Sequence, residues 1–285
     1  MIGKLAIVGV GLIGGSLARA AKRAGIVSEV VGIGRDDASL QRGVELGVID
    51  RFTTDIGSGV ADADMVVIAV PLATISKLLP QLKASMPADA VLTDVGSAKA
   101  SVVEDVRTVF GQIPANFVPG HPIAGTEKSG VEASFAELFD NRRVILTPLP
   151  ESAPEAIAKV RLLWEQAGAE VIEMGVEHHD EVLAATSHLP HVLAYALVDA
   201  LARGEQGEEI FRYAAGGFRD FSRIASSHPV MWRDICLANR GAILKMLKHF
   251  TDDLNEIADS IEKGDGDHLL ELFSRAKAAR DRYCG

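Results

Sequence analysis

A glycine-rich turn near the N-terminus limits what this chain can fold into more than any other feature. Residues 4–8 read as a buried strand, Gly9, Gly11 and Gly14 follow in G-x-G-x-x-G spacing, and residues 16–24 continue as a helix. In this context the first glycine permits a tight turn, the second lets backbone N–H groups approach a pyrophosphate, and the third permits close helix packing. A purely structural turn is the alternative. The pattern predicts a dinucleotide-binding site.

Strand and helix patterns alternate along the rest of the first 175 residues. Such alternation indicates a mainly parallel, doubly wound sheet with helices on both faces. The sequence therefore predicts an α/β, Rossmann-type dinucleotide-binding domain over residues 1–175. The further strand-like apolar runs are residues 29–33, 65–70, 90–94, 117–118, 143–146 and 170–174.

After residue 175 the pattern changes, because no β-branched run of strand length recurs and segments with helical periodicity take over. These segments predict an all-helical domain over residues 176–285. Three or four helices in roughly 110 residues form only a marginal core, so we expect this domain to pair with a copy of itself in a homodimer. The helical segments are residues 178–203, 207–214, 229–263 and 267–282.

Charge and composition exclude several classes of protein. The net charge of −10 argues against a nucleic-acid or anionic-membrane surface. The longest apolar run, residues 5–17, is interrupted by glycines and is shorter than the roughly 20 residues of a membrane span. No secretory signal pattern is readable, so we expect a cytoplasmic protein. Cys236 and Cys284 lie far apart without metal-ligand spacing, so neither a disulfide framework nor a metal site is predicted.

Two adjacent residues bear on the choice of cofactor. A dinucleotide site usually has a carboxylate for the ribose hydroxyls at the end of the second strand, where this chain has Gly34 followed by Arg35. Without a carboxylate at this position, nothing there repels the 2′-phosphate of NADP, and the guanidinium of Arg35 can bind that phosphate. Both features favour NADP over NAD. Asp36 or Asp37 serving the ribose, with Arg35 solvated, is the alternative. The predicted cofactor-binding residues are Gly9, Val10, Gly11, Leu12, Ile13, Gly14, Gly34, Arg35, Val70, Pro71 and Ser97.

Three dense polar stretches follow, at residues 94–99, 120–130 and 187–191. The first two come after predicted strands, where ligands gather in an open α/β sheet. On the loop after the second of these strands, His121 can accept a proton from a substrate hydroxyl while hydride leaves the same carbon. Ser97 is placed to hydrogen-bond either His121 or a nicotinamide. A His-Pro turn with a satisfied imidazole is the alternative for His121.

Five motifs in order resemble the prephenate/arogenate (cyclohexadienyl) dehydrogenase family of tyrosine biosynthesis. They are GVGLIGGS (9–16), DVGSAK (94–99), GHPIAGTEKSG (120–130), SHLPH (187–191) and GGFRDFSRIA (216–225), and they span nearly the whole chain. The resemblance implies a dinucleotide domain followed by a helical dimerisation domain. It also implies hydride transfer from ring C4 to NAD(P), loss of CO2 from C1 and aromatisation of the ring. Both prephenate and arogenate, which differ in a keto or an amino group, are substrates within this family.

The resemblance also assigns catalytic roles to two residues. His121 matches the catalytic histidine, which hydrogen-bonds the ring hydroxyl and accepts its proton. Ser97 matches the serine that orients this histidine and touches the nicotinamide. No metal is required by this reaction.

Further residues match the family's substrate pocket. Arg223 matches an arginine that binds a substrate carboxylate, and Asp220 lies three residues earlier on the same helical face. Glu127, His191 and Trp232 match residues that line or gate the pocket. For Asp220 and Arg223 a surface ion pair is the alternative, and for Trp232 a core position is.

Two other classes of protein share parts of this pattern. β-Hydroxyacid dehydrogenases and imine reductases also join a dinucleotide domain to a helical domain, but the hydroxyacid enzymes resemble one another in a Lys-x-x-Asn motif. None of the four asparagines here has a lysine three residues earlier. A non-catalytic nucleotide-sensing protein is the third class, and it has no need of His121, Ser97 and Arg223 together. The chain also lacks a basic helix-turn-helix segment.

Overall fold

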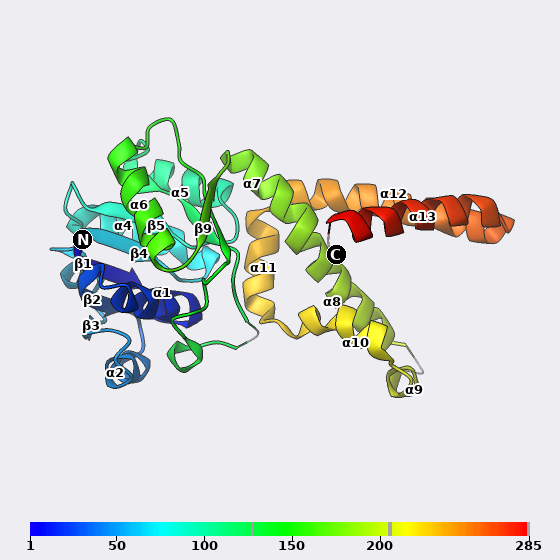
Figure 1. Cartoon of the computed structure of the whole chain (residues 1–285), viewed down its shortest axis with the longest axis horizontal. Helices are drawn as coiled ribbons and strands as arrows, with labels where there is room; N and C mark the ends of the chain where they lie inside the picture. Colours follow the sequence, from blue (N-terminus) through cyan, green and yellow to red (C-terminus); the bar gives the residue numbers. More distant parts are fainter. Residues whose placement is uncertain (127, 205–206, 284–285) are drawn as a thin grey trace. The chain divides into compact units, whose positions relative to one another are not determined.

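Six parallel strands form the central sheet of the chain (Figure 1). The structure is a computed structural model that describes residues 1–126, 128–204 and 207–283. The strand order is β3-β2-β1-β4-β5-β6, so the order reverses between β1 and β4. This arrangement confirms the predicted Rossmann-type α/β fold. The strands are β1 (Ile2–Val8), β2 (Val27–Ile33), β3 (Arg51–Thr53), β4 (Met65–Ile68), β5 (Val91–Asp94) and β6 (Phe117–Val118).

Both faces of this sheet are covered by helices. Leu5 and Ile7 of β1 belong to one buried apolar cluster, and Ala6 and Val8 belong to the other. Because successive side chains of a strand point to opposite faces, a strand that is apolar throughout must be buried on both sides. Helices α1 and α6 contribute to the first cluster, α3, α4 and α5 to the second. The helices are α1 (Leu12–Arg23), α2 (Asp37–Glu45), α3 (Ile56–Val60), α4 (Leu72–Ser85), α5 (Ala100–Phe110) and α6 (Pro154–Gln166).

A second, three-stranded sheet corrects part of the prediction. β7 (Gly120–Pro122) pairs antiparallel with β8 (Arg143–Leu146), which pairs parallel with β9 (Glu170–Glu173). The segments 143–146 and 170–174, predicted as strands of the main sheet, belong to this separate sheet. His121 therefore lies on a strand opposite Ile145, and its predicted position on a loop was wrong. A short 3-10 helix, η1 (Val131–Ala133), lies between β7 and β8.

The chain after residue 175 is helical, as predicted from the sequence. The predicted helical segment 178–203 contains a π-helical turn, and the predicted segment 229–263 is interrupted at Asn239. The elements are α7 (Val176–Leu183), the π-helical turn η2 (Ala184–His188), α8 (Leu189–Ala202), α9 (Gly207–Arg212), α10 (Gly216–Ser222), η3 (Arg223–Ser226), α11 (Pro229–Ala238), α12 (Arg240–Lys263) and α13 (Gly266–Tyr283).

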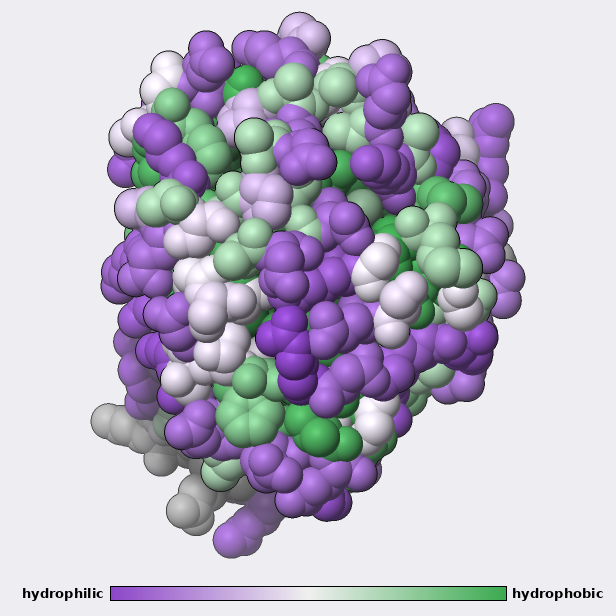
Figure 2. Space-filling model, turned by 90° about the vertical axis from the view of Figure 1, so that its left-hand side faces the viewer, coloured by the Kyte–Doolittle hydropathy of each residue, from purple (hydrophilic) through white to green (hydrophobic). Residues whose placement is uncertain are grey.

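The contacts divide the chain into two units, Met1–Arg240 and Gly241–Gly285. The first unit contains both sheets and the helices up to α11, and the second contains nearly all of α12 together with α13. The predicted domain boundary at residue 175 stays a prediction. Figure 2 views the molecule from the side on which the α/β part lies in Figure 1; hydrophilic residues there are interspersed with small hydrophobic areas. None of the helices in the described ranges is long and apolar enough to cross a membrane.

Candidate active site

The glycine turn after β1 is shaped by contacts that only glycine tolerates. Gly9 has φ +102°, and a Cβ there would lie 2.4 Å from the carbonyl oxygen of Ala69. A Cβ on Gly14 would lie 2.2 Å from the carbonyl oxygen of Gly9. A Cβ on Gly11, by contrast, would meet nothing within 4 Å. The turn is therefore closed against β4 at Gly9 and Gly14 and open at Gly11, where a ligand can approach the backbone.

Helix α1 begins at this opening with uncapped backbone amides. Its N-cap residue, Gly11, has no side chain to accept a hydrogen bond, and its first turn contains no acidic residue. Such a helix start presents free N–H groups and a positive dipole end, which suit a pyrophosphate. Val70 packs against the turn, since its Cγ1 would lie 2.9 Å from a Cβ on Gly9, and Pro71 is the N-cap of α4. The residues present thus fit a dinucleotide at the point where the strand order reverses.

The end of β2 presents the residues predicted to choose between cofactors. Asp36 caps α2, because its side chain accepts a hydrogen bond from the backbone N–H of Ser39 at 3.0 Å. Arg35 is exposed, and Gly34 is half-buried beside Leu40. The carboxylate of Asp36 is therefore engaged in capping α2.

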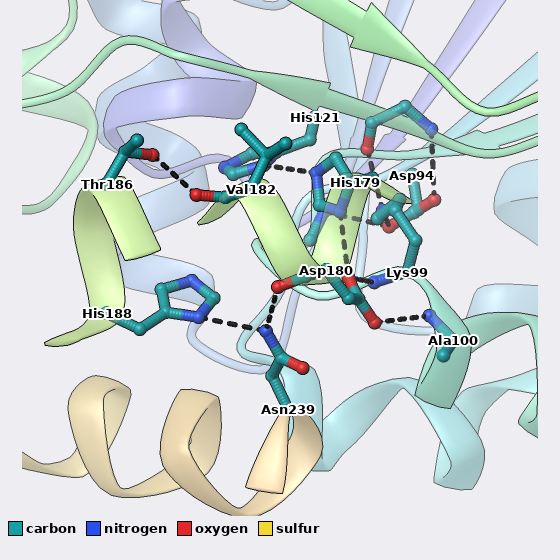
Figure 3. Close-up of polar contacts among 12 residues, drawn as sticks. Asp94, Lys99, Ala100, His121, His179, Asp180, Val182, Thr186, His188 and Asn239 are labelled. Carbon is teal, nitrogen blue, oxygen red and sulfur yellow. Dashed lines mark hydrogen bonds and ion pairs between the residues drawn. The ribbon is translucent and has the colours of Figure 1, made fainter. Parts of the chain in front are cut away.

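His121 lies at the head of a buried chain of hydrogen bonds (Figure 3). Its Nδ1 is 2.9 Å from Nε2 of His179, and Nδ1 of His179 is 2.8 Å from Oδ1 of Asp180. His121 is 8% exposed, whereas His179 is fully buried. Within the described residues no hydrogen bond reaches Nε2 of His121. That nitrogen is the one left for a substrate.

The surroundings of His121 keep its ring neutral. Burial lowers its pKa well below 6.5, and the nearby His179, Lys99 and His188 lower the pKa further because each disfavours another positive charge. A histidine that is neutral at pH 7 has a lone pair with which to accept a proton. The site therefore supplies a base rather than an acid at this position.

A fully buried ion pair fixes the backbone next to His121. Lys99 Nζ contacts Asp94 Oδ2 and donates a hydrogen bond to the carbonyl oxygen of Gly120 at 2.7 Å. The other oxygen of Asp94 accepts the N–H of Gly120 at 3.3 Å. Burial lowers the pKa of Lys99, and the charge of Asp94 opposes this shift. The pair connects the end of β5 and the start of α5 to the strand that presents His121.

A second cluster surrounds the π-helical turn. His188 ends that turn, and its Nδ1 lies 3.1 Å from the side-chain amide nitrogen of Asn239 (Figure 3). The same nitrogen of Asn239 donates a hydrogen bond to the carbonyl oxygen of Asp180 at 2.8 Å. Burial lowers the pKa of His188 to about 4. The backbone of Ser97 lies near His188 and partly opposes this shift. Ser97 itself makes no hydrogen bond to His121 within the described residues, and Nδ1 of His121 contacts His179 instead.

An aromatic stack joins two of the predicted pocket residues. His191 and Trp232 lie with ring centroids 3.7 Å apart at an interplanar angle of 19°. Burial lowers the pKa of His191, and the positive charge of Arg223 contributes to the shift. Trp232 Nε1 is buried and has no hydrogen-bond partner in the described residues. His188 meets the other side of this group, with its ring 6.1 Å from that of Trp232.

The remaining predicted residues are placed less closely. Asp220 is exposed on α10, one turn before Arg223. Glu127 lies outside the described residues. Hydrogen bonds and ring contacts thus connect His121, through His179, Asp180 and Asn239, to His188, Trp232 and His191, while the roles of Arg223 and Asp220 stay predictions.

Several residues of the site had no predicted role, among them Lys99, His179, Asp180 and Asn239. Lys99 and Asp94 stand at the two ends of the DVGSAK motif, and this pairing of opposite charges in one motif could have indicated the ion pair. His179 and Asp180 come at the start of α7, directly after the strand β9. Their partners lie 58 and 81 residues earlier, so no local pattern could identify them.

Comparisons with known proteins identify the family of this chain. The domain family described as "Prephenate dehydrogenase, nucleotide-binding domain" matches residues 17–173, and "Prephenate dehydrogenase, dimerization domain" matches residues 175–275. The cyclohexadienyl dehydrogenase of Zymomonas mobilis is 40% identical over 97% of this chain and 94% of its own length. The prephenate dehydrogenase of Bacillus subtilis is 38% identical over 96% of this chain and 74% of its own.

Solved structures show the same similarity over both domains. The prephenate dehydrogenase of A. aeolicus, in complex with hydroxyphenyl propionate and NAD+, superposes with a TM-score of 0.92 at 37% identity, covering 99% of this chain and 98% of that one. The arogenate dehydrogenase of Synechocystis gives a TM-score of 0.83 at 29% identity, covering 98% and 99%. From its sequence, its fold and the matches to both domain families, this chain belongs to the prephenate dehydrogenase family.

Proposed function

We propose that this chain oxidatively decarboxylates a cyclohexadienyl substrate, prephenate or arogenate or both, in tyrosine biosynthesis. The observation that carries the proposal is His121, a buried neutral histidine whose Nε2 has no partner in the described part of the chain. It follows β6, whose neighbours in the sheet lead through β5 and β4 to the glycine turn after β1. A base beside a dinucleotide turn is what removal of hydride from an alcohol carbon requires.

The proposed steps use few side chains. Nicotinamide, when bound, accepts the hydride from C4 of the ring. His121 Nε2 draws the proton of the C4 hydroxyl as a carbonyl forms there. The C1 carboxylate then leaves as CO2, its bonding electrons pass into the ring, and the resulting phenolate oxygen takes the proton back from His121. Aromatisation makes the sequence effectively irreversible, so the protein mainly has to align C4, hold the substrate and move this proton.

Arg223 binds a substrate carboxylate in this proposal. A guanidinium offers two parallel donors that match a carboxylate. The stacked His191 and Trp232 form an aromatic wall of the pocket in this proposal, and the buried indole N–H of Trp232 has no partner among the described residues. Ser97, on the turn before α5, would help to hold a bound nicotinamide.

NADP is the preferred cofactor in this proposal, with NAD as the alternative. Gly34 offers no carboxylate, Arg35 is exposed at the ribose end of the site, and Asp36 is engaged in capping α2. A 2′-phosphate therefore meets the guanidinium of Arg35 at this strand end, and position 34 offers no carboxylate to repel it.

A turnover assay tests these proposals together. Purified protein is given prephenate or arogenate with NADP or NAD, and reduced cofactor and released CO2 are measured in parallel. We expect equal amounts of both products and a higher kcat/KM with NADP. Equal or better use of NAD would overturn the cofactor assignment. Reduced cofactor without CO2 would indicate a hydroxyacid-type dehydrogenase, and cofactor binding without turnover would indicate a sensing protein.

A further inference from the structure

We propose that His179 and Asp180 are positioning residues that hold His121 in the tautomer with its proton on Nδ1 and a free lone pair on Nε2. The proposal rests on the proposed function, because it explains how the base of that reaction is kept ready. It concerns two residues that do not need to touch the substrate. Their effect passes through the hydrogen bonds drawn in Figure 3.

The first step is the carboxylate of Asp180, which is held as an acceptor. Its Oδ1 accepts the backbone N–H of Lys99 at 2.8 Å, and its Oδ2 accepts the backbone N–H of Ala100 at 3.0 Å. Burial on its own raises the pKa of Asp180, but the hydrogen bonds from His179 and from these two amides together lower it. Asp180 is therefore ionised at neutral pH and has no proton to donate.

The second step is the orientation of His179. Since the Asp180 carboxylate only accepts, the 2.8 Å contact requires the proton of His179 to be on Nδ1. Burial lowers the pKa of His179, although the hydrogen bond to Asp180 opposes this shift. In the neutral ring with Nδ1 protonated, Nε2 carries a lone pair. His179 is thus an acceptor on the side that faces His121.

The third step fixes His121 itself. Its Nδ1 lies 2.9 Å from Nε2 of His179. Because this Nε2 carries a lone pair, Nδ1 of His121 must carry the proton. Its Nε2 is then unprotonated and can take the hydroxyl proton. In the other neutral tautomer of His179, with its proton on Nε2, the lone pair of Nδ1 faces the Asp180 carboxylate. A doubly protonated His179 donates a hydrogen bond from its Nε2 to Nδ1 of His121, which forces the proton of His121 onto its own Nε2. Both arrangements disable the base.

The charged groups around the two histidines act in both directions, and burial together with the cations keeps both rings neutral. Lys99 lowers the pKa of both rings, and His188 lowers that of His121. Asp94 and Asp180 raise the pKa of His179, but burial outweighs them. We call the hydrogen bonds from Asp180 through His179 to His121 the relay. The relay requires a neutral His179, because a protonated His179 would reverse the direction of the hydrogen bond to His121.

The test replaces His179 with residues that do or do not accept a hydrogen bond. In His179→Phe the ring fills the space but cannot accept from His121 Nδ1, whereas in His179→Gln an amide oxygen can take the place of Nε2. The matched control is His178→Phe, since His178 is the exposed neighbour on the same helix. The tautomer of His121 is read from 15N NMR of histidine-labelled, unliganded protein, with His121→Asn used to assign the signal.

We expect His121 to be protonated on Nδ1 in the unmodified protein, in His178→Phe and in His179→Gln. In His179→Phe we expect a shift toward Nε2 protonation and a fall in kcat of about 10- to 1000-fold with less than about threefold change in KM. His179→Gln should recover most of this loss. Protonation of His121 on Nε2 in the unmodified protein would overturn the proposal, whether or not His179→Phe folds.

The spectroscopic measurement separates this proposal from the proposed function. The tautomer is read without substrate, so it stands even if neither prephenate nor arogenate is turned over. A protein that is active while His179→Phe keeps both the Nδ1 tautomer and its kcat would overturn the relay and leave the function intact.

Discussion

His121 owes its suitability as a base to its neighbours more than to its own chemistry. A free histidine has a pKa near 6.5 and is partly protonated at neutral pH. Here burial, with His179, Lys99 and His188 nearby, lowers the pKa well below that value. The ring is therefore neutral at pH 7, and its protonated form is reached only at lower pH.

Replacing His121 with Asn should remove the base while leaving the cofactor turn unchanged. We expect kcat to fall by roughly 10²–10⁴-fold and the dissociation constant for NADP to stay within about twofold. In the unmodified protein, the acid limb of kcat/KM that reports His121 should lie well below pH 6.5, because activity is lost only as this lowered pKa is passed. Steady-state kinetics across pH measure both effects. A His121→Asn variant with near-normal kcat would exclude His121 from the chemistry.

Arg223 is expected to act on binding rather than on the chemical step. A charge-assisted contact to a carboxylate is worth about 1.5–3 kcal/mol, so Arg223→Ala should raise KM for prephenate by roughly 10- to 150-fold. Arg223→Lys should recover part of the loss, because it keeps the charge but not the two-donor geometry. Steady-state kinetics and circular dichroism of each variant are the measurements. An unchanged KM in a folded Arg223→Ala would remove this residue from the substrate site.

Among the elements, the π-helical turn Ala184–His188 joins two parts of the site. The turn precedes α8, which presents His191, and it places His188 against Asn239 and the backbone of Ser97. Asn239 interrupts the helical run between α11 and α12, and its side chain bonds His188 and Asp180. Two irregularities in helices thus hold the site's histidines in place.

The burial of His188 predicts that the folded chain loses stability in acid. The pKa of His188 is about 4 in the folded chain against 6.5 for a free histidine, so the unfolded chain binds more protons between these values. The contribution of His188 is fully present above pH 6.5 and is lost as pH falls toward 4, which corresponds to roughly 3 kcal/mol. Urea unfolding at a series of pH values measures it.

His188→Asn isolates this contribution, because its amide oxygen can accept from Asn239 but does not titrate. We expect its free energy of unfolding to fall less steeply than that of the unmodified protein between pH 6.5 and about 4.5, by about 2–3 kcal/mol. Parallel curves for the two proteins would show that His188 does not carry the acid sensitivity.

The sequence predicted the elements whose signals are local. The apolar strands, the glycine turn and the helices that follow it depend on short-range periodicity and on glycine conformation. β7 was missed because Gly120, His121 and Pro122 show no alternation of apolar residues, and only pairing with β8 makes them a strand. The relay of His179 and Asp180 was missed for a similar reason, since its contacts join residues far apart in the chain.

On the scale of the whole chain, the second unit, Gly241–Gly285, exposes several large apolar side chains. α12 and α13 present several large apolar side chains to solvent: Leu244 (63%), Leu254 (48%), Ile261 (64%), Leu270 (66%) and Phe273 (54%) are exposed to these extents. Such side chains on two neighbouring helices suit burial against a symmetry mate. We therefore expect a homodimer in which this unit takes part.

Replacing Leu270 and Phe273 with Glu should shift this dimer toward monomer. Burying a large apolar side chain contributes about 1.5–3 kcal/mol, so the two substitutions should raise the dissociation constant by on the order of 100-fold or more. Light scattering at micromolar concentrations measures the change. Leu162→Glu is the matched control, since Leu162 is 47% exposed on α6 of the other unit and should leave the dimer intact. A monomeric unmodified protein, or a dimer indifferent to both α13 substitutions, would exclude this helix from the interface.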